Sequence, residues 1–150
     1  MKAVIQRVKY ASVNVDDSLV SSIDKGILVL LGITNSDSKD DILWLSKKIA
    51  NLRIFNDPSG VMNLSLKDVE GEAIIVSQFT LMANTKKGNR PSYTKAARAE
   101  IAIPLYNEFI KTFEELMGKK VGTGHFGADM KIELLNDGPV TIIIDTENKQ

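Results

Sequence analysis

The feature that most constrains the fold is a glycine-proline pair set between two apolar runs near the end of the chain. The stretch LLNDGPVTIIID alternates like a β-ribbon on both sides of Gly138 and Pro139. Proline has no amide hydrogen to donate to a sheet ladder, so it belongs at an edge, a bulge or the first position of a strand. One interpretation is a hairpin turn stiffened by the proline; the other is a rigid kink on a cis bond, which base rates disfavour.

The first third of the chain also predicts sheet, followed by a helix. KAVIQRV and ASVNV alternate with period 2 and lead into LVSSI and the apolar run GILVLLGI, which together predict a β-meander ending in a buried strand. After a Ser38/Asp41 capping pattern, apolar residues recur at helical spacing. They are Ile42, Leu45, Ile49 and Leu52. We therefore expect an amphipathic helix after the sheet.

The remainder alternates between strand and helix signals. NDPSG predicts a turn and GEAIIVSQFTLMA a central strand, whereas residues 93–117 predict a long helix that Pro104 kinks or divides and Gly118 stops. Period 2 returns from Met130 onward. This order of elements predicts an α+β domain rather than a regular βαβ array.

Composition narrows the class of protein and of chemistry. The 150 residues fit one domain, no apolar run spans a bilayer, and the N-terminus lacks a signal peptide's apolar region, so we expect a cytoplasmic protein without membrane contact. There is no cysteine and one histidine, which excludes thiolate chemistry and the usual metal clusters, so we expect no metal or cofactor. The chain has 19 basic residues (lysine plus arginine) and 19 acidic residues (aspartate plus glutamate), so no net positive charge attracts long nucleic acids to the protein as a whole.

Three motifs have a plainer interpretation beside the functional one. GTGHFG matches a dinucleotide fingerprint with Asp145 as the ribose acid, but its flanks do not read as strand and helix, which favours a turn. His125 lacks the nucleophile elbow that a Ser-His-Asp triad would need. Lys86, Lys87 and Arg90 in KKGNRP form either a phosphate grip or a solvated loop, and both interpretations stay open.

For the stretch SQFTL, a functional interpretation is slightly favoured over a structural one. A buried strand normally continues with apolar residues, because an unpartnered polar group taken from water costs roughly 1 to 3 kcal/mol. Ser77, Gln78 and Thr80 break the run at the end of the predicted strand, where a rigid scaffold can hold binding groups. Alternatively, the strand simply leaves the core there.

SQFTL and NDGPVT together make the chain resemble the D-aminoacyl-tRNA deacylases, also called D-tyrosyl-tRNA deacylases. The similarity extends from MKAVIQRVKYASVNVD through KIANLRIFND to VSQFTL with KKGNRPS, and to TGHFGADM with NDGPVT. Two separated signatures in the expected order make this match specific. His125 departs from the family pattern, so we do not expect it to be essential.

The resemblance implies a single-domain homodimer with a mixed, barrel-like sheet and helices packed on it. It implies hydrolysis of the ester between a D-amino acid, or glycine, and the 3′-terminal adenosine of tRNA, with tRNA recognised at its acceptor end. Gly138 and Pro139 of one subunit would form a cis bond and read chirality in the other subunit's site. The implied site residues are Ser77, Gln78, Phe79 and Thr80 around the ester, Phe126 on the adenosine side and Arg7 in support of the Gly-Pro loop.

Chemistry on this site must do without a conventional base. Thr80 is a poor nucleophile without a neighbouring base, so the 2′-OH of the terminal ribose is the alternative, with Gln78 and backbone amides stabilising the oxyanion. Two fixed carbonyls that bind the ammonium would leave room for a D side chain and reject an L side chain. The rival hypotheses are a non-catalytic dimeric module that binds RNA ends and a dinucleotide-dependent enzyme.

Overall fold

The first strand, β1 (Lys2–Val15), organises the sheet in this computed structural model, which describes residues 1–149. Its first half pairs antiparallel with β3 (Gly26–Gly32), and its second half pairs antiparallel with β2 (Ser18–Ile23). The predicted meander is therefore wrong in its order. β2 and β3 follow one another along a single bent partner and do not pair with each other.

The sheet is mixed, as the resemblance implied. β6 (Glu72–Ser77) runs parallel to β3, and the short β7 (Gly122–Thr123) runs parallel to β6. The strand order is β2-β1-β3-β6-β7, and β8 pairs with β1. A small separate hairpin, β4 (Phe55–Asn56) and β5 (Met62–Leu64), encloses the predicted NDPSG turn.

Two helices follow the predicted signals closely. α1 (Lys39–Asn51) begins with the capping box, in which Asp41 Oδ2 accepts hydrogen bonds from the backbone N–H and the hydroxyl of Ser38, each at 2.9 Å. α2 (Ala99–Met117) ends at Gly118, which adopts the left-handed conformation. Pro104 lies inside one continuous helix. The helix starts later than predicted because residues 93–98 run extended and turn-like, with Ala97 N–H bonded to the Ile33 carbonyl at 2.9 Å.

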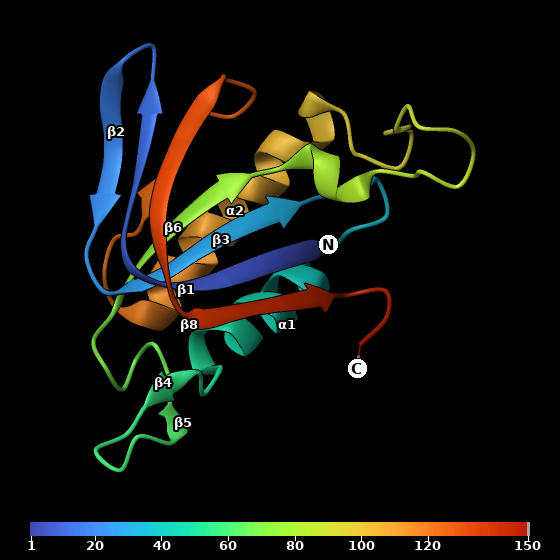
Figure 1. Ribbon diagram of the computed structural model, residues 1–150. Coiled ribbons are helices and arrows are strands. Elements are labelled where there is room, and N and C mark those ends of the chain that lie inside the picture. Colours follow the sequence, from blue (N-terminus) through green and yellow to red (C-terminus); the bar gives the residue numbers. More distant parts are fainter. Residues whose placement is uncertain (150) are drawn as a thin grey trace.

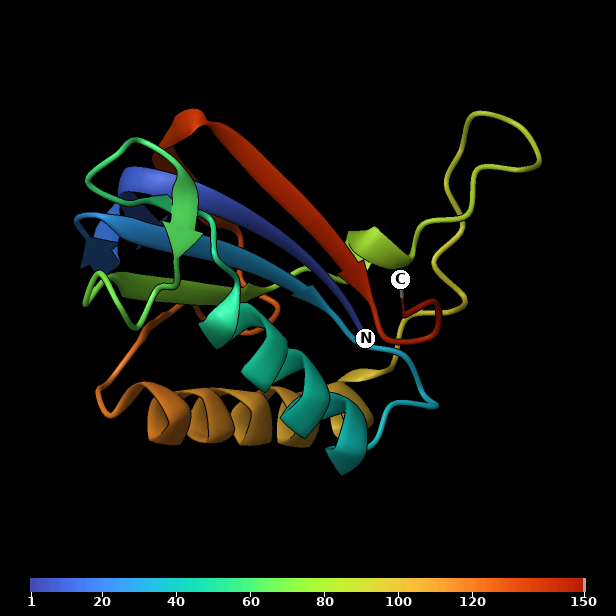
Figure 2. The same ribbon diagram turned by 90° about the horizontal axis from the view of Figure 1, so that it is seen from below.

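Both helices cover the same face of the sheet, and the sheet curls round on its other side (Figure 1, Figure 2). One apolar cluster joins the helices to the sheet through residues such as Leu45, Phe109 and Phe113. A second cluster fills the inside of the curl, where Val13, Leu28 and neighbours meet β8. The chain is thus a single α+β domain with a nearly closed, barrel-like sheet, as predicted. Neither helix in the described part of the chain is long and apolar enough to cross a membrane.

The Gly-Pro pair lies in a bulge within one continuous strand, β8 (Met130–Asp145). Asn136 pairs with Val8 and Thr141 with Gln6, so residues 137–140 lie opposite Arg7 alone. The Gly138–Pro139 peptide bond is cis. The hairpin interpretation is wrong, because β8 bends at the bulge (Figure 1) but stays paired with β1 on both sides of it and does not fold back on itself.

Candidate functional site

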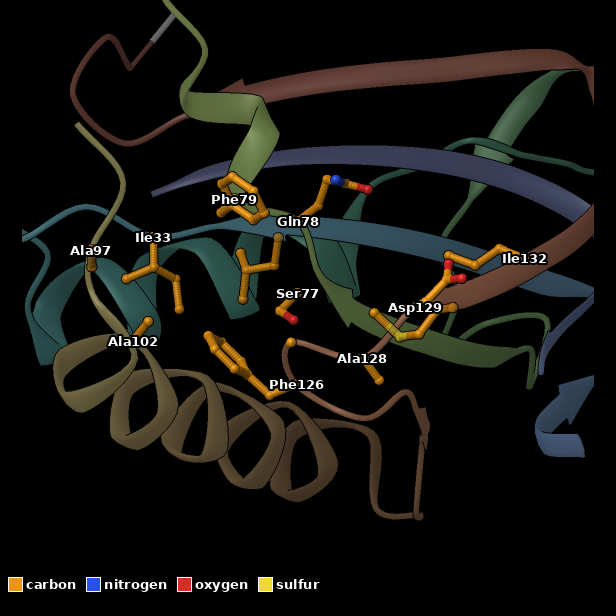
Figure 3. A pocket seen from close by; sticks show the side chains of 13 residues that line it. Ile33, Ser77, Gln78, Phe79, Ala97, Ala102, Phe126, Ala128, Asp129 and Ile132 are labelled. Atoms are coloured by element: carbon orange, nitrogen blue, oxygen red, sulfur yellow. The ribbon is translucent and has the colours of Figure 1, made fainter. Parts of the chain in front are cut away.

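A cavity of about 280 Å³ opens where β3 and β6 end, beside the start of α2. Four segments line it, and Figure 3 shows their side chains converging on one space. They lie around the end of β6 with Ser77, Gln78 and Phe79, around the end of β3 with Leu31 and Ile33, around the start of α2 with Ala97 and Ala102, and in the segment leading into β8 with Phe126 to Met130 and Ile132. Residues predicted from two distant motifs therefore share one cavity.

The SQFTL stretch is shorter as a strand than predicted. β6 ends at Ser77, and residues Phe79–Met82 form a single 3-10 turn, η1. The backbone N–H of Gln78 still bonds to the Leu31 carbonyl at 2.8 Å, which fixes the turn to β3. The turn packs so closely on β3 that a Cβ atom on Gly32 would lie 2.8 Å from Met82 Cε. The polar residues therefore occupy a rigid corner after the strand.

Gln78 and Thr80 are bonded to each other within this corner. The Gln78 side-chain amide donates to Thr80 Oγ1 at 2.5 Å. Thr80 does not line the cavity, and Figure 3 shows the Gln78 side chain directed away from Phe126. The first amides of η1, at Phe79 and Thr80, have no acceptor inside the turn, since the first N–H groups of any helix lack one. Donors for a developing negative charge are thus present beside the cavity.

Phe126 closes the opposite wall, supported by a tyrosine that the sequence interpretation missed. The Tyr106 ring lies 6.1 Å from that of Phe126, and its buried hydroxyl donates to the Ile75 carbonyl at 2.7 Å. Burial raises the Tyr106 pKa to about 12, and a hydrogen bond with the Gly124 backbone partly offsets this. The sequence did contain a signal for Tyr106, which lies one helical turn after Ala102 and so on the same buried face of α2. A tyrosine on a buried face usually has a hydrogen-bond partner for its hydroxyl.

Asp129 is a second missed residue and is the one titratable side chain in the cavity lining. Its carboxylate is paired with the Lys131 ammonium at 2.9 Å, and both groups are exposed. His125, next to Phe126, is also exposed and does not line the cavity. The site therefore offers hydroxyl, amide and aromatic groups and one carboxylate, that of Asp129. Residues 1–149 contain no cluster of acidic, histidine or cysteine residues that could hold a metal.

Gly138 and Pro139 are exposed and lie outside the cavity of their own chain. The bulge faces Arg7, which pairs with Ile27, and Ile27 pairs with Ala73 near the start of β6. The cavity lies beyond the other end of β6, roughly 15 Å away at about 3.3 Å per strand residue. Within one chain the structure brings these two residues to Arg7 but not to the predicted site residues at the cavity.

Arg7 is buried and holds the bulge from below. Its guanidinium donates to the Asp137 carbonyl at 3.1 Å and to the Ile54 carbonyl at 2.6 Å, and lies 3.4 Å from the Asp137 carboxylate. The Asn136 amide bridges the carbonyls of Arg7 and Val140, at 3.0 Å each. A Cβ atom on Gly138, whose φ is +120°, would lie 2.7 Å from the guanidinium. Backbone carbonyls in this loop are therefore held in fixed directions.

The structure gives different outcomes for the two other motifs, GTGHFG and KKGNRP. GTGHFG begins in β7, and no helix follows it within residues 1–149, so the dinucleotide hypothesis is wrong for this fold. The cations Lys86, Lys87 and Arg90 are exposed and lie on a loop that extends away from the sheet (Figure 1, Figure 2). They do not line the cavity, but their loop joins two residues that do, Phe79 and Ala97.

Comparisons with known proteins agree over nearly the whole chain. A family model described as D-Tyr-tRNA(Tyr) deacylase matches residues 4–145. Proteins named D-aminoacyl-tRNA deacylase from Flavobacterium psychrophilum and Bacteroides thetaiotaomicron are 64% and 60% identical over 150 residues, which is 100% of each chain.

Solved structures give the same picture of the fold. One titled "c-Myc DNA Unwinding Element Binding Protein" has a TM-score of 0.92 at 41% identity and covers 97% of this chain and 99% of its own. A probable eukaryotic D-amino acid tRNA deacylase has a TM-score of 0.82 at 17% identity, covering 95% and 97%, and supports the fold alone.

Proposed function

The chain belongs to the D-Tyr-tRNA(Tyr) deacylase family and is a D-aminoacyl-tRNA deacylase, and from this premise we propose how its residues act. The substrate is the ester between a D-amino acid, or glycine, and the 3′-terminal adenosine of tRNA. Its hydrolysis returns mischarged tRNA to use and leaves L-aminoacyl-tRNA intact. The observation that carries the proposal is that Ser77 to Phe79 and Phe126, from two distant motifs, line one cavity.

The ester lies against the corner after β6. Ser77, Phe79 and Phe126 contact the substrate, with Phe126 on the adenosine side. During attack the carbonyl oxygen gains negative charge, and donors already in place stabilise it without reorganisation. The amides at the start of η1 and the Gln78 side chain supply these donors. Their fixed position on β3 supports this role.

Water attacks the ester carbonyl with help from the ribose 2′-OH. The resulting tetrahedral species expels the 3′-oxygen, which takes a proton, so the products are the free amino acid and tRNA with an intact 3′-OH. Thr80 is less suited to attack, because its oxygen accepts a hydrogen bond from Gln78 and its activation would need a base. Orientation of the substrate and its own hydroxyl then do most of the catalysis.

Chirality is read by the Gly138 and Pro139 carbonyls of a second copy of the chain. They bind the substrate ammonium, so the D side chain points to open space and an L side chain meets the protein. The roughly 15 Å between bulge and cavity in one chain supports a contribution from the partner. The bulge is exposed and anchored by Arg7, as a rigid projecting element requires.

The outer edge of β8 supports the homodimer. This edge has no strand partner within residues 1–149, and it carries exposed Leu135 and Ile143, at 47% and 68% exposure. An exposed apolar strand edge is a ready interface for another chain. A dimer formed here would cover this edge.

Release of amino acid from D-tyrosyl-, glycyl- and L-tyrosyl-tRNA tests the proposal. We expect hydrolysis of the first two and at least about 100-fold slower hydrolysis of the third, since 2.7 kcal/mol of steric discrimination corresponds to that ratio. Comparable release from L-tyrosyl-tRNA would overturn the chirality mechanism.

The rival class is a non-catalytic dimeric module that binds nucleic-acid ends. The structure 41% identical to this chain is titled as a DNA-binding protein, and the exposed basic loop is compatible with nucleic acid. A purified Gln78→Ala/Pro139→Ala double variant separates the two hypotheses. Undiminished ester hydrolysis by that variant would point to a contaminating hydrolase and favour the binding module.

A further inference from the structure

One segment beside the cavity carries basic residues without any acidic residue to balance them. The chain as a whole carries 19 basic and 19 acidic residues, yet residues 73–99 contain basic side chains and no acidic one. The basic residues are Lys86, Lys87, Arg90, Lys95 and Arg98. None of them forms an ion pair with a carboxylate within residues 1–149. A neutral protein thus presents a local cationic surface.

Three of these cations lie on a closed arm, residues 84–92, which we call the basic arm. The backbones of Asn84 and Ser92 exchange hydrogen bonds of 2.8 and 3.0 Å at its base, and the Asn84 side chain accepts from Lys86 N–H at 2.9 Å. The arm extends away from the body of the molecule (Figure 2). With its base closed in this way, the arm is held as a projection rather than a loose connection.

The base of the basic arm also carries exposed aromatic surface. The rings of Phe79 and Tyr93 meet edge to face, with centroids 5.1 Å apart, and are 56% and 37% exposed. Phe79 lines the cavity, so the aromatic pair lies between the proposed ester site and the arm. Aromatic faces next to cations are the usual combination on surfaces that bind single-stranded nucleic acid.

We propose that the basic arm binds the phosphates of the unpaired 3′ end of tRNA, just before the terminal adenosine. An arm of about four residues on each side reaches roughly 13 Å at 3.3 Å per residue, which matches about four nucleotides at 3.4 Å each. Phosphate contacts position a nucleic acid without reading its sequence. This inference rests on the proposed function, which places the terminal adenosine in the cavity.

The five basic residues do not contribute equally to the proposed phosphate binding, because some of them lie beside acidic residues. Lys86 and Lys95 border a second, more polar cavity that Asp145 and Glu147 also line. Lys2 also lines this cavity and pairs with Asp145 at 3.5 Å, so Glu147 is the acid of the lining that weakens phosphate binding on that side. Lys87 and Arg90 line neither cavity, so they carry the larger share of the contact.

The test compares two triple variants with equal loss of charge. The arm variant is Lys86→Ala/Lys87→Ala/Arg90→Ala, and the control is Lys39→Ala/Lys47→Ala/Lys67→Ala, three exposed lysines elsewhere. The probe is an RNA hairpin that carries the unpaired 3′ end of tRNA without an attached amino acid. Its binding is followed by fluorescence anisotropy at several salt concentrations. Each lost contact lowers affinity about fivefold at 0.1 M salt and reduces the salt slope by about 0.7.

We expect the arm variant to bind about 25- to 125-fold more weakly, with a slope smaller by about 1.4 to 2.1 for two to three lost contacts, and the control to bind like the wild type. The charge-conserving variant Lys86→Arg/Lys87→Arg/Arg90→Lys keeps tight binding. Equal affinity of the arm variant and the control overturns the inference, whatever their catalytic activity.

A second measurement separates this inference from the proposed function. D-tyrosyl-adenosine lacks the upstream phosphates, so the arm variant should hydrolyse it at the wild-type rate while its KM for D-tyrosyl-tRNA rises. If the wild type hydrolyses neither substrate, the proposed function fails, and the binding result still decides the role of the arm. An equal loss on both substrates would contradict a role in binding phosphate.

Discussion

The corner after β6 and the Gly-Pro bulge of β8 are built in opposite ways. The corner is concave, and in the part of the chain that the structure describes the Gln78–Thr80 bond is its one polar side-chain pair. The bulge is exposed, and hydrogen bonds from the side chains of Arg7 and Asn136 fix its backbone. The contrast indicates a division of work: the corner leaves space for the substrate, and the bulge supplies rigid backbone that only another molecule can use.

Removal of the substrate's own hydroxyl should have the largest effect. With D-tyrosyl-tRNA ending in 2′-deoxyadenosine, we expect kcat to fall about 1,000-fold, within the range for loss of acid-base assistance. Thr80→Val should reduce kcat about tenfold or less, and single-turnover kinetics measures both. A Thr80→Val loss larger than the deoxy effect would make Thr80 the nucleophile.

Gln78→Ala should reduce kcat about 100- to 1,000-fold, as expected for loss of an oxyanion donor. KM should change little, because the interaction strengthens only as charge develops. Asn107→Ala, which removes an exposed amide from α2, is the matched control. A rise in KM with unchanged kcat would limit Gln78 to substrate binding.

Arg7→Met tests the rigidity of the bulge. It leaves the buried carbonyl of Ile54 and the partly buried carbonyl of Asp137 without their donor, so we expect a loss of about 2 to 4 kcal/mol in the free energy of unfolding. Selectivity for D- over L-tyrosyl-tRNA should fall about tenfold as the bulge loosens. Arg7→Lys should not restore selectivity, because an ammonium lacks the planar fork. Denaturant unfolding and paired D and L assays measure both effects.

Tyr106→Phe should have the smallest effect on activity. We expect a few-fold rise in KM through Phe126 and a loss of about 1 kcal/mol in stability, because the Ile75 carbonyl loses its donor. The Tyr106 pKa, about 12 in the fold and near 10 when unfolded, means that the protonated form is favoured by folding. Stability from this group is complete below pH 10 and declines as pH rises toward 12. Wild type should therefore lose stability faster than Tyr106→Phe between these values; parallel unfolding curves would contradict this.

Local patterns predicted the elements well where one physical signal dominated. α1 begins at its Ser38/Asp41 capping box, and α2 ends at Gly118, because cap chemistry is encoded within a few residues. The strand through SQFTL was overextended, since apolar Phe79 and Leu81 resemble a strand although the chain turns at Gln78. Nothing local encodes that turn, which depends on close packing against Gly32.

Pairing over long distances was beyond the local patterns. The bulge at Gly138 exists because Arg7, 131 positions earlier in the sequence, faces residues 137–140 alone. Tyr106 and Asp129 were missed because their places beside the cavity depend on how α2 and the loop before β8 dock on β6. The family resemblance supplied Arg7 and Phe126, whose positions no period or spacing indicates.

Mixed dimers test whether each active site is shared between two copies of the chain. Gln78→Ala and Pro139→Ala chains with different affinity tags are each assayed as homodimers, and the doubly tagged heterodimer is then purified. We expect little activity in either homodimer and about half the wild-type activity per dimer in the heterodimer, where one intact corner faces one intact bulge. A heterodimer as inactive as both homodimers would mean that corner and bulge must belong to the same chain, and would contradict a shared site.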